Sequence, residues 1–169
     1  MKHYDYSTPN YYFVTICTKD KRCLFGNAGQ LNTLGQIARD RLLETSAHFP
    51  EVTVDKYVVM PNHIHAILIL RQQNVQLTTI IGQYKAAVTK EARAIYPDID
   101  IWQTSFHDHI IRNQASYEKN LAVYRRKPSK MAGGLFLYRN SRTLLITHES
   151  LPGRRGHDPA LQNRMRKDL

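Results

Sequence analysis

The sequence predicts an α+β fold in which helices cover one face of an antiparallel sheet. Segments rich in β-branched and aliphatic residues alternate with segments whose apolar residues recur every three or four positions. They come in the order strand, helix, strand, strand, helix, strand, and the two central strands are separated by a two-residue turn. The chain has 169 residues, 42% of them hydrophobic, which suits a single core of ordinary size.

The first half of the chain supplies one helix and three strands. Residues 11–18, Tyr-Tyr-Phe-Val-Thr-Ile-Cys-Thr, have the composition of a strand. A helix is expected to start at residue 32 or 33, where Asn or Thr can cap it, and to end near residue 47, before a proline. Residues 52–60 predict the second strand. Pro61-Asn62 then turns the chain into a third strand, which ends near residue 70.

The second half supplies two more helices around a further strand. A helix is expected at about 78–96, and residues 99–111 predict one strand or two short ones. A last helix at about 116–127 ends before a proline. Without this last helix, the order of elements is the βαββαβ of a ferredoxin-like sandwich. We therefore expect a domain at residues 1–130, followed at 131–169 by a basic extension with a short hairpin and a mobile tail.

The charge of the chain indicates a polyanionic partner. The net charge is +10 and the isoelectric point is about 9.8, values typical of proteins that bind nucleic acid. From residue 125 onward the sequence has eleven lysines and arginines but only three acidic residues, although a solvated basic tail with no specific role is an alternative. No apolar run is long enough to span a bilayer, and Cys17 and Cys23 match no zinc or redox motif. We expect a cytoplasmic protein with no membrane partner.

Two histidines on the third strand are candidate metal ligands. His63 and His65 are two residues apart, so on a strand their side chains point to the same face. Imidazole can bind a divalent cation, and such an ion can polarise a phosphoryl oxygen. The alternative is that both are surface histidines on a half-exposed strand.

Three motifs carry a resemblance to a known family. They are Tyr-Phe-Val-Thr-Ile-Cys-Thr at 12–18, Met-Pro-Asn-His-Ile-His at 60–65, and Ile-Trp-Gln at 101–103 with Phe-His-Asp-His-Ile-Ile-Arg-Asn at 106–113. With these motifs in this order, residues 11–128 resemble the single-tyrosine HUH transposases, most of all the REP-associated tyrosine transposases. The resemblance implies an enzyme that uses Mg²⁺ or Mn²⁺, held by His63 and His65, to cleave single-stranded DNA beside a hairpin.

The resemblance also implies the chemistry and the partners. A tyrosine of the last helix attacks phosphorus, leaving a 5′-phosphotyrosine and a free 3′-hydroxyl, and resealing to another 3′-hydroxyl completes strand transfer. The partners are single-stranded or hairpin DNA, and the sequence leaves a homodimer open. An RNA-binding protein on the same scaffold is a further alternative to the enzyme, but the first and last strands lack the aromatic and glycine pattern of such proteins.

The nucleophile is displaced from the position that the family pattern gives it. That pattern places the tyrosine at position 123 and an amide metal ligand at position 127, whereas this chain has Val123, Tyr124 and Lys127. An ammonium has no lone pair to give a cation. Either the helix is rotated or bulged so that Tyr124 is the nucleophile, or the chain binds hairpin DNA without cleaving it. Tyr117 lies one heptad before Tyr124, so both could also be packing residues.

The remaining candidates are predicted DNA contacts. Cations on the second helix could face phosphate, and the second His-x-His motif with the arginine after it suits phosphate or base contacts. Trp102 could stack an unpaired base, with core packing as the alternative. The predicted set is Lys85, Lys90, Arg93, Trp102, His107, His109, Arg112, Arg125 and Arg126.

Overall fold

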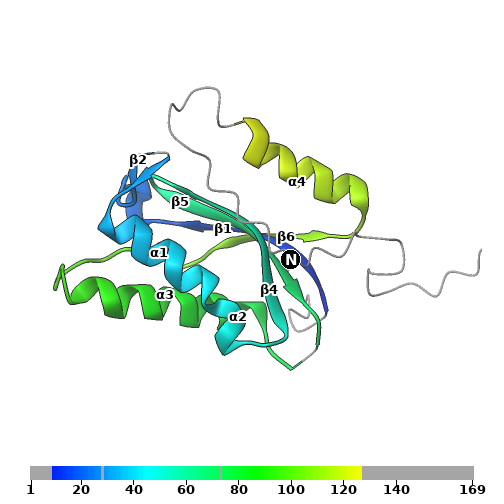
Figure 1. Ribbon diagram of the computed structural model, residues 1–169, viewed down its shortest axis with the longest axis horizontal. Coiled ribbons are helices and arrows are strands. Elements are labelled where there is room, and N and C mark those ends of the chain that lie inside the picture. The colour runs from blue at the N-terminus through cyan, green and yellow to red at the C-terminus, as the bar shows by residue number, and fades with distance from the viewer. Residues whose placement is uncertain (1–8, 28, 73, 127–169) are drawn as a thin grey trace, which may run out of the picture.

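A computed structural model describes residues 9–27, 29–72 and 74–126 (Figure 1). Its main sheet has four strands in the order β4-β5-β1-β6, and every neighbouring pair is antiparallel. The strands are β1 (Asn10–Cys17), β4 (Val52–Met60), β5 (His63–Leu70) and β6 (His107–Ile111). This strand order, with the helices between, confirms the predicted ferredoxin-like sandwich.

One face of the sheet is covered by α1 (Thr33–Leu43), α2 (Thr45–His48) and α3 (Leu77–Arg93), as Figure 1 shows. Alternate residues of β1 and β5 point into this layer, as the period of a strand requires. Its buried side chains include Tyr12, Val14 and Ile16 of β1, Ile64 and Leu68 of β5, and Ile80, Tyr84 and Val88 of α3. Asn32 caps α1, as predicted, because its side chain accepts a hydrogen bond from the Gly35 amide at 2.9 Å.

The opposite face is crossed by α4 (Gln114–Arg126), which packs on a smaller apolar cluster (Figure 1). Tyr117 is 7% exposed, contacts the Tyr11 ring edge-on, and donates from its hydroxyl to Asp55, which is 3% exposed. Asp55 lies at a β-bulge between Val54 and Lys56. Burial and the nearby Asp55 carboxylate raise the pKa of Tyr11. The first turns of α4 are therefore anchored to the sheet by a buried polar contact.

The prediction of a strand over residues 99–111 was wrong for its first half. Strand β6 begins at His107, and before it only an isolated bridge joins Trp102 to Thr18. The reason is that this segment is tied to α3 instead: the ammonium of Lys85 donates to the carbonyls of residues 103, 104 and 105. Helix α3 also ends at Arg93, three residues earlier than predicted.

Three further short elements are present. The charged sequence Lys-Asp-Lys-Arg at 19–22 indicates a turn, and its first three residues form the 3₁₀ turn η1 (Lys19–Lys21). The small hairpin formed by β2 (Gly26–Asn27) and β3 (Gln30–Leu31) was not predicted. The expected domain boundary at residue 130, the later hairpin and the tail lie outside the described residues. In the described part of the chain, no helix is long and apolar enough to cross a membrane.

Candidate active site

His63 and His65 lie side by side on the sheet face that α4 crosses. In the register of the sheet, His63 is opposite Cys17 and His65 is opposite Thr15. Both imidazoles are half-buried, their ring centroids are 4.6 Å apart, and their Nε2 atoms face each other at 3.1 Å. The predicted pair is thus brought together through the same ring nitrogen on each residue.

The other ring nitrogen of each histidine is held by a neighbour. Nδ1 of His63 donates to the side-chain oxygen of Asn62 at 2.7 Å. The orientation of that amide is set because its nitrogen donates to the Lys21 carbonyl at 3.2 Å. Nδ1 of His65 lies 2.9 Å from the Thr15 hydroxyl, which can donate or accept. The lone pair of His63 Nε2 therefore points at His65, whichever tautomer His65 adopts.

This arrangement fits a divalent cation. Two adjacent ligands on an octahedral ion, each about 2.1 Å from it, lie about 3.0 Å apart, close to the separation of the two Nε2 atoms. Holding the second ring nitrogen with an oxygen is how metal-binding imidazoles are usually oriented. Within residues 9–126, apart from the two undescribed positions, no group of three or more His, Cys, Asp or Glu could hold a metal. The pair would supply two positions, and water or phosphate oxygens would fill others.

The second His-x-His pair lies on the same sheet face but is arranged differently. Thr15 is opposite both His65 and His107, so β1 separates the two pairs. His107 and His109 are exposed on the edge strand β6, and Nε2 of His109 lies 3.3 Å from the hydroxyl of Ser116 on α4.

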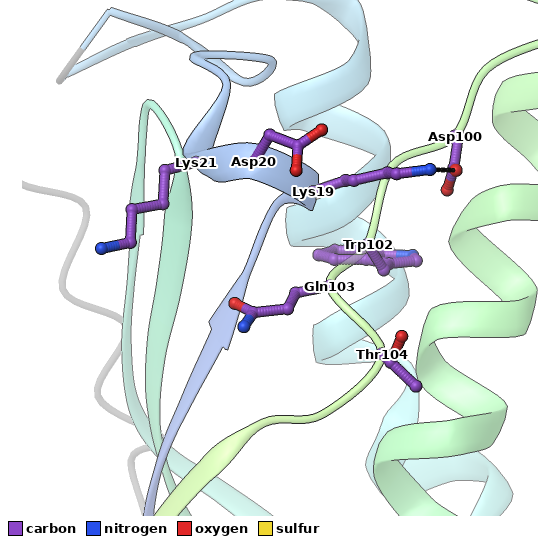
Figure 2. Close-up of a pocket in the computed structure, with 7 residues that line it drawn as sticks. All are labelled: Lys19, Asp20, Lys21, Asp100, Trp102, Gln103 and Thr104. Atoms are coloured by element: carbon purple, nitrogen blue, oxygen red, sulfur yellow. Dashed lines mark hydrogen bonds and ion pairs between the residues drawn. The ribbon is translucent and has the colours of Figure 1, made fainter.

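A cavity opens at the end of the sheet where β1 meets η1 (Figure 2). Its volume is about 530 Å³, and it is lined by Lys19, Asp20, Lys21, Asp100, Trp102, Gln103 and Thr104. Asp20 and Lys21 both have left-handed backbone angles, with φ of 53° and 54°, a conformation that residues other than glycine rarely adopt. The charged sequence 19–22 was visible as a turn, but its contact with Asn62 could not be read from it.

Comparison with known proteins identifies the family. The family model described as "Transposase IS200 like" matches residues 7–122. The chain belongs to this family. The IS200-like transposases are HUH-type nucleases, and the match covers both His-x-His motifs, Asn62 and the first turns of α4.

Two curated proteins of one bacterium are similar in sequence to this chain. The chain is 35% identical to an uncharacterised protein of Haemophilus influenzae Rd, over 69% of this chain and 79% of that one. It is 24% identical to a second protein of the same strain, provisionally named a REP-associated tyrosine transposase, over 75% and 74%.

Two solved structures share the fold. A REP-associated tyrosine transposase bound to a REP hairpin superposes with a TM-score of 0.56 and 23% identity, over 77% of this chain and 74% of that one. A protein of Deinococcus radiodurans R1, provisionally described as a transposase, gives 0.52 and 14%, over 75% and 97%.

The family match ends at residue 122, directly before Val123 and two residues before the displaced Tyr124. Helix α4 is α-helical throughout Gln114–Arg126, so the bulge that could have restored the family register is not present there. Positions 117 and 124 share one helix face, because seven residues make nearly two turns. Position 123 shares the neighbouring face with Ser116, the residue that contacts His109 on the edge strand.

The predicted DNA contacts of this chain fall into four groups. Lys90, Arg93 and Arg112 are exposed, as are His107 and His109. Lys85 is half-buried and donates to three carbonyls, and burial lowers its pKa, so it holds the 103–105 segment rather than facing solvent. Trp102 packs between Phe25 and Tyr84, at centroid distances of 5.6 and 5.7 Å. Arg125 and Arg126 lie in the last turn of α4.

Proposed function

We propose that this IS200-like transposase cleaves and rejoins single-stranded DNA beside a hairpin, through a covalent bond to Tyr124. The observation that carries the proposal is the facing pair of Nε2 atoms on His63 and His65, each imidazole oriented by a hydrogen bond on its far side. A surface pair with no function has no need of two such orienting contacts. The Mg²⁺ or Mn²⁺ that this pair would hold supplies charge neutralisation at the scissile phosphate.

The residues around the pair keep it ready to bind. Asn62 fixes the proton of His63 on Nδ1, which leaves Nε2 as a base. The Thr15 hydroxyl can donate a hydrogen bond to Nδ1 of His65 or accept one from it. The proton of His65 can therefore be on Nε2 or on Nδ1 without loss of this contact. The two imidazoles can therefore both present lone pairs to one cation.

Tyr124 is the proposed nucleophile because of the helix face that it shares with Tyr117. Tyr117 contacts Tyr11 of β1 and Asp55 of β4, the two strands on either side of β5. Seven residues advance about 10.5 Å along a helix, and four residues of strand advance about 13.5 Å. Position 124 is thus expected near the level of Thr15 and His65, over the inner strands. Position 123 lies on the face toward the edge strand β6.

The reaction conserves the phosphodiester bond energy. The Tyr124 phenol oxygen forms a bond to phosphorus. The bond between phosphorus and the 3′ oxygen breaks, and its electron pair stays on the 3′ oxygen. The phenol loses its proton and the departing 3′ oxygen gains one, which gives a 5′-phosphotyrosine and a free 3′-hydroxyl. Attack by a second 3′-hydroxyl reverses these changes and rejoins a strand.

Hairpin-flanked DNA is the proposed substrate. The net charge of +10 and the exposed cations Arg93 and Arg112 suit a phosphate backbone. The solved relative of the same fold was bound to a REP hairpin. A homodimer remains compatible with this substrate.

A second function is binding of such DNA without cleavage. The observation that favours it is the departure from the family pattern at the reactive helix, where Val123 and Lys127 stand at the positions of the tyrosine and the amide ligand. In that case the histidine pair would remain as an inherited feature with no reaction to support.

A covalent-adduct assay separates the two functions. A labelled pool of hairpin-flanked single strands is first enriched for strands that the protein binds, then incubated with Mn²⁺ and analysed under denaturing conditions. Wild type, Tyr124→Phe and the double variant Val123→Tyr with Lys127→Asn are compared. Tyr96→Phe, a change to an exposed tyrosine outside the site, is the matched control.

The proposal expects an adduct in the wild type and in Tyr96→Phe, its loss in Tyr124→Phe, and its loss with a chelator. An adduct in the double variant alone would assign the chain to DNA binding without cleavage. An adduct that persists in Tyr124→Phe would overturn Tyr124 as the nucleophile.

A further inference from the structure

The cavity beside η1 has one wall built to stay in place. Trp102 is partly buried between Phe25 and Tyr84, and its indole nitrogen donates to the Lys85 carbonyl at 3.1 Å. The Trp102 bridge to Thr18 fixes its backbone as well. Figure 2 shows the indole lying across the cavity below Lys19. The cavity therefore offers a rigid aromatic surface that is not wholly used by the core.

The rest of the lining has the groups that read the edge of a base. Gln103 and Thr104 are exposed and carry an amide and a hydroxyl, and Figure 2 shows Gln103 pointing toward β1. The carboxylates of Asp20 and Asp100 can accept from exocyclic amines and would repel a bare anion. A volume of about 530 Å³ lies within the range of small-molecule sites.

Cations around the same cavity suit the phosphate that a nucleotide carries. Lys19 and Lys21 line it, and Lys19, Arg22 and Arg93 all lower the pKa of Asp100 by their proximity. The contact between Lys19 and Asp100 is an exposed ion pair, which is held weakly, so both groups are available to a ligand.

The cavity shares its supports with the histidine pair. The Lys21 carbonyl accepts from Asn62, whose oxygen holds His63. On the other side, the backbone N–H of Gln103 donates to the carbonyl of Cys17, the residue opposite His63 in the sheet. A strand whose phosphate lies at the two imidazoles would have a neighbouring nucleotide within reach of this cavity.

We propose that this cavity is a subsite for one unpaired nucleobase of the DNA strand, which contacts Trp102 and is read by Gln103, next to the cleaved phosphate. It rests on the proposed function, because it assigns a place to a nucleotide of the same substrate. Bases in a duplex are stacked and paired, so the site selects single-stranded DNA. Contact with an aromatic ring is sequence-tolerant, whereas the amide and carboxylates would favour particular bases.

The chain has one tryptophan, so its fluorescence reports on this cavity alone. The full-length protein is titrated in EDTA, which prevents cleavage, with twelve-nucleotide strands of deoxyadenylate, deoxycytidylate or thymidylate. A twelve-nucleotide abasic strand has the same phosphates and no bases. Inorganic phosphate is a third probe. Binding is followed by anisotropy of a labelled strand and by quenching of Trp102.

We expect at least one base-bearing strand to quench Trp102 and to bind about tenfold more tightly than the abasic strand. The abasic strand and inorganic phosphate should leave the fluorescence unchanged. Gln103→Ala should reduce the preference for bases, while Gln83→Ala, an exposed glutamine on α3, should not. Both changes are at the surface, so the fold is retained.

Equal affinity for base-bearing and abasic strands, or binding without quenching, would overturn the subsite. Quenching in a protein that forms no covalent adduct would uphold the subsite and contradict cleavage. Adduct formation without quenching would do the reverse.

Discussion

Two copies of the same three-residue motif lie on one face of one sheet, and only one of them forms a pair. His63 and His65 face each other through Nε2 at 3.1 Å, whereas His107 and His109 are exposed on the edge strand, and His109 contacts Ser116. The residues between the histidines do not explain this, since both motifs lie on strands and share the alternation of side chains.

The difference lies in the neighbours. The first pair is on an inner strand directly after the β4–β5 turn, where Asn62 and Thr15 hold the outer ring nitrogens. The second pair is on the edge strand β6, with β1 on one side only. A motif of two histidines thus becomes a candidate metal site through residues that the motif does not contain.

The largest effect is expected on metal affinity, when histidines of the His63–His65 pair are replaced and compared with those of the His107–His109 pair. We expect His63→Ala and His65→Ala each to weaken Mn²⁺ binding by more than about 100-fold, because a ligand itself is lost rather than its outer partner. His107→Ala and His109→Ala should leave Mn²⁺ affinity unchanged. Calorimetric titration of the four variants measures this, and equal losses in both pairs would contradict the distinction.

The next effect concerns the amide that orients His63. Asn62→Ala removes the acceptor for Nδ1 and the contact with the Lys21 carbonyl, so His63 can adopt the wrong tautomer or turn away. We expect Mn²⁺ affinity to fall by about 10- to 100-fold. Asn62→Asp, which retains an acceptor, should lose less. If Asn62→Ala bound Mn²⁺ as wild type does, the neighbours would not be the deciding feature.

A smaller effect, on the free energy of unfolding, should distinguish two adjacent residues of α4: Tyr117, which contacts β4, and Ser116, which contacts β6. Tyr117→Phe leaves the buried Asp55 without that hydroxyl donor, and the free energy of unfolding should fall by about 1–3 kcal/mol. Ser116→Ala removes an exposed contact with His109 and should change it by no more than about 0.5 kcal/mol. Urea denaturation of both variants tests the contrast, which a larger loss in Ser116→Ala would reverse.

The smallest effect is expected for DNA binding by the edge pair. The double change His107→Ala with His109→Ala should reduce affinity for single-stranded DNA only a few-fold, since exposed side chains add contacts to a surface that is already basic. Anisotropy at two salt concentrations measures it. A loss as large as that of a metal ligand would place the edge pair in the reaction itself.

Most of the fold could be predicted because its signals are local. The β-branched and aliphatic residues of 52–70, divided by Pro61-Asn62, predict two strands without further information. The alternation of side chains along a strand then predicts the shared face of His63 and His65. The supports of the pair could not be predicted, because Thr15 is 50 residues from His65 and Lys21 is 41 residues from Asn62. Those contacts depend on strand register and on an irregular loop, neither of which a local pattern specifies.

Lys85 shows the same limit from another side. Its place on the second predicted helix led us to predict a contact with phosphate. What the sequence could not indicate was that the segment before β6 is irregular, and that its backbone carbonyls therefore need donors. The role of Tyr124 remains a prediction for a related reason, since it depends on how a helix is rotated over a sheet.

The buried contact between Tyr117 and Asp55 fixes α4 on the sheet through its first turns. From there the helix continues across the sheet face opposite α1 and α3 (Figure 1). The angle at which its later residues cross the sheet is therefore set by packing around Asp55, a buried residue of β4, whereas the two histidines belong to β5. A substitution at Asp55 is expected to change that angle while the backbone of both histidines stays in the sheet.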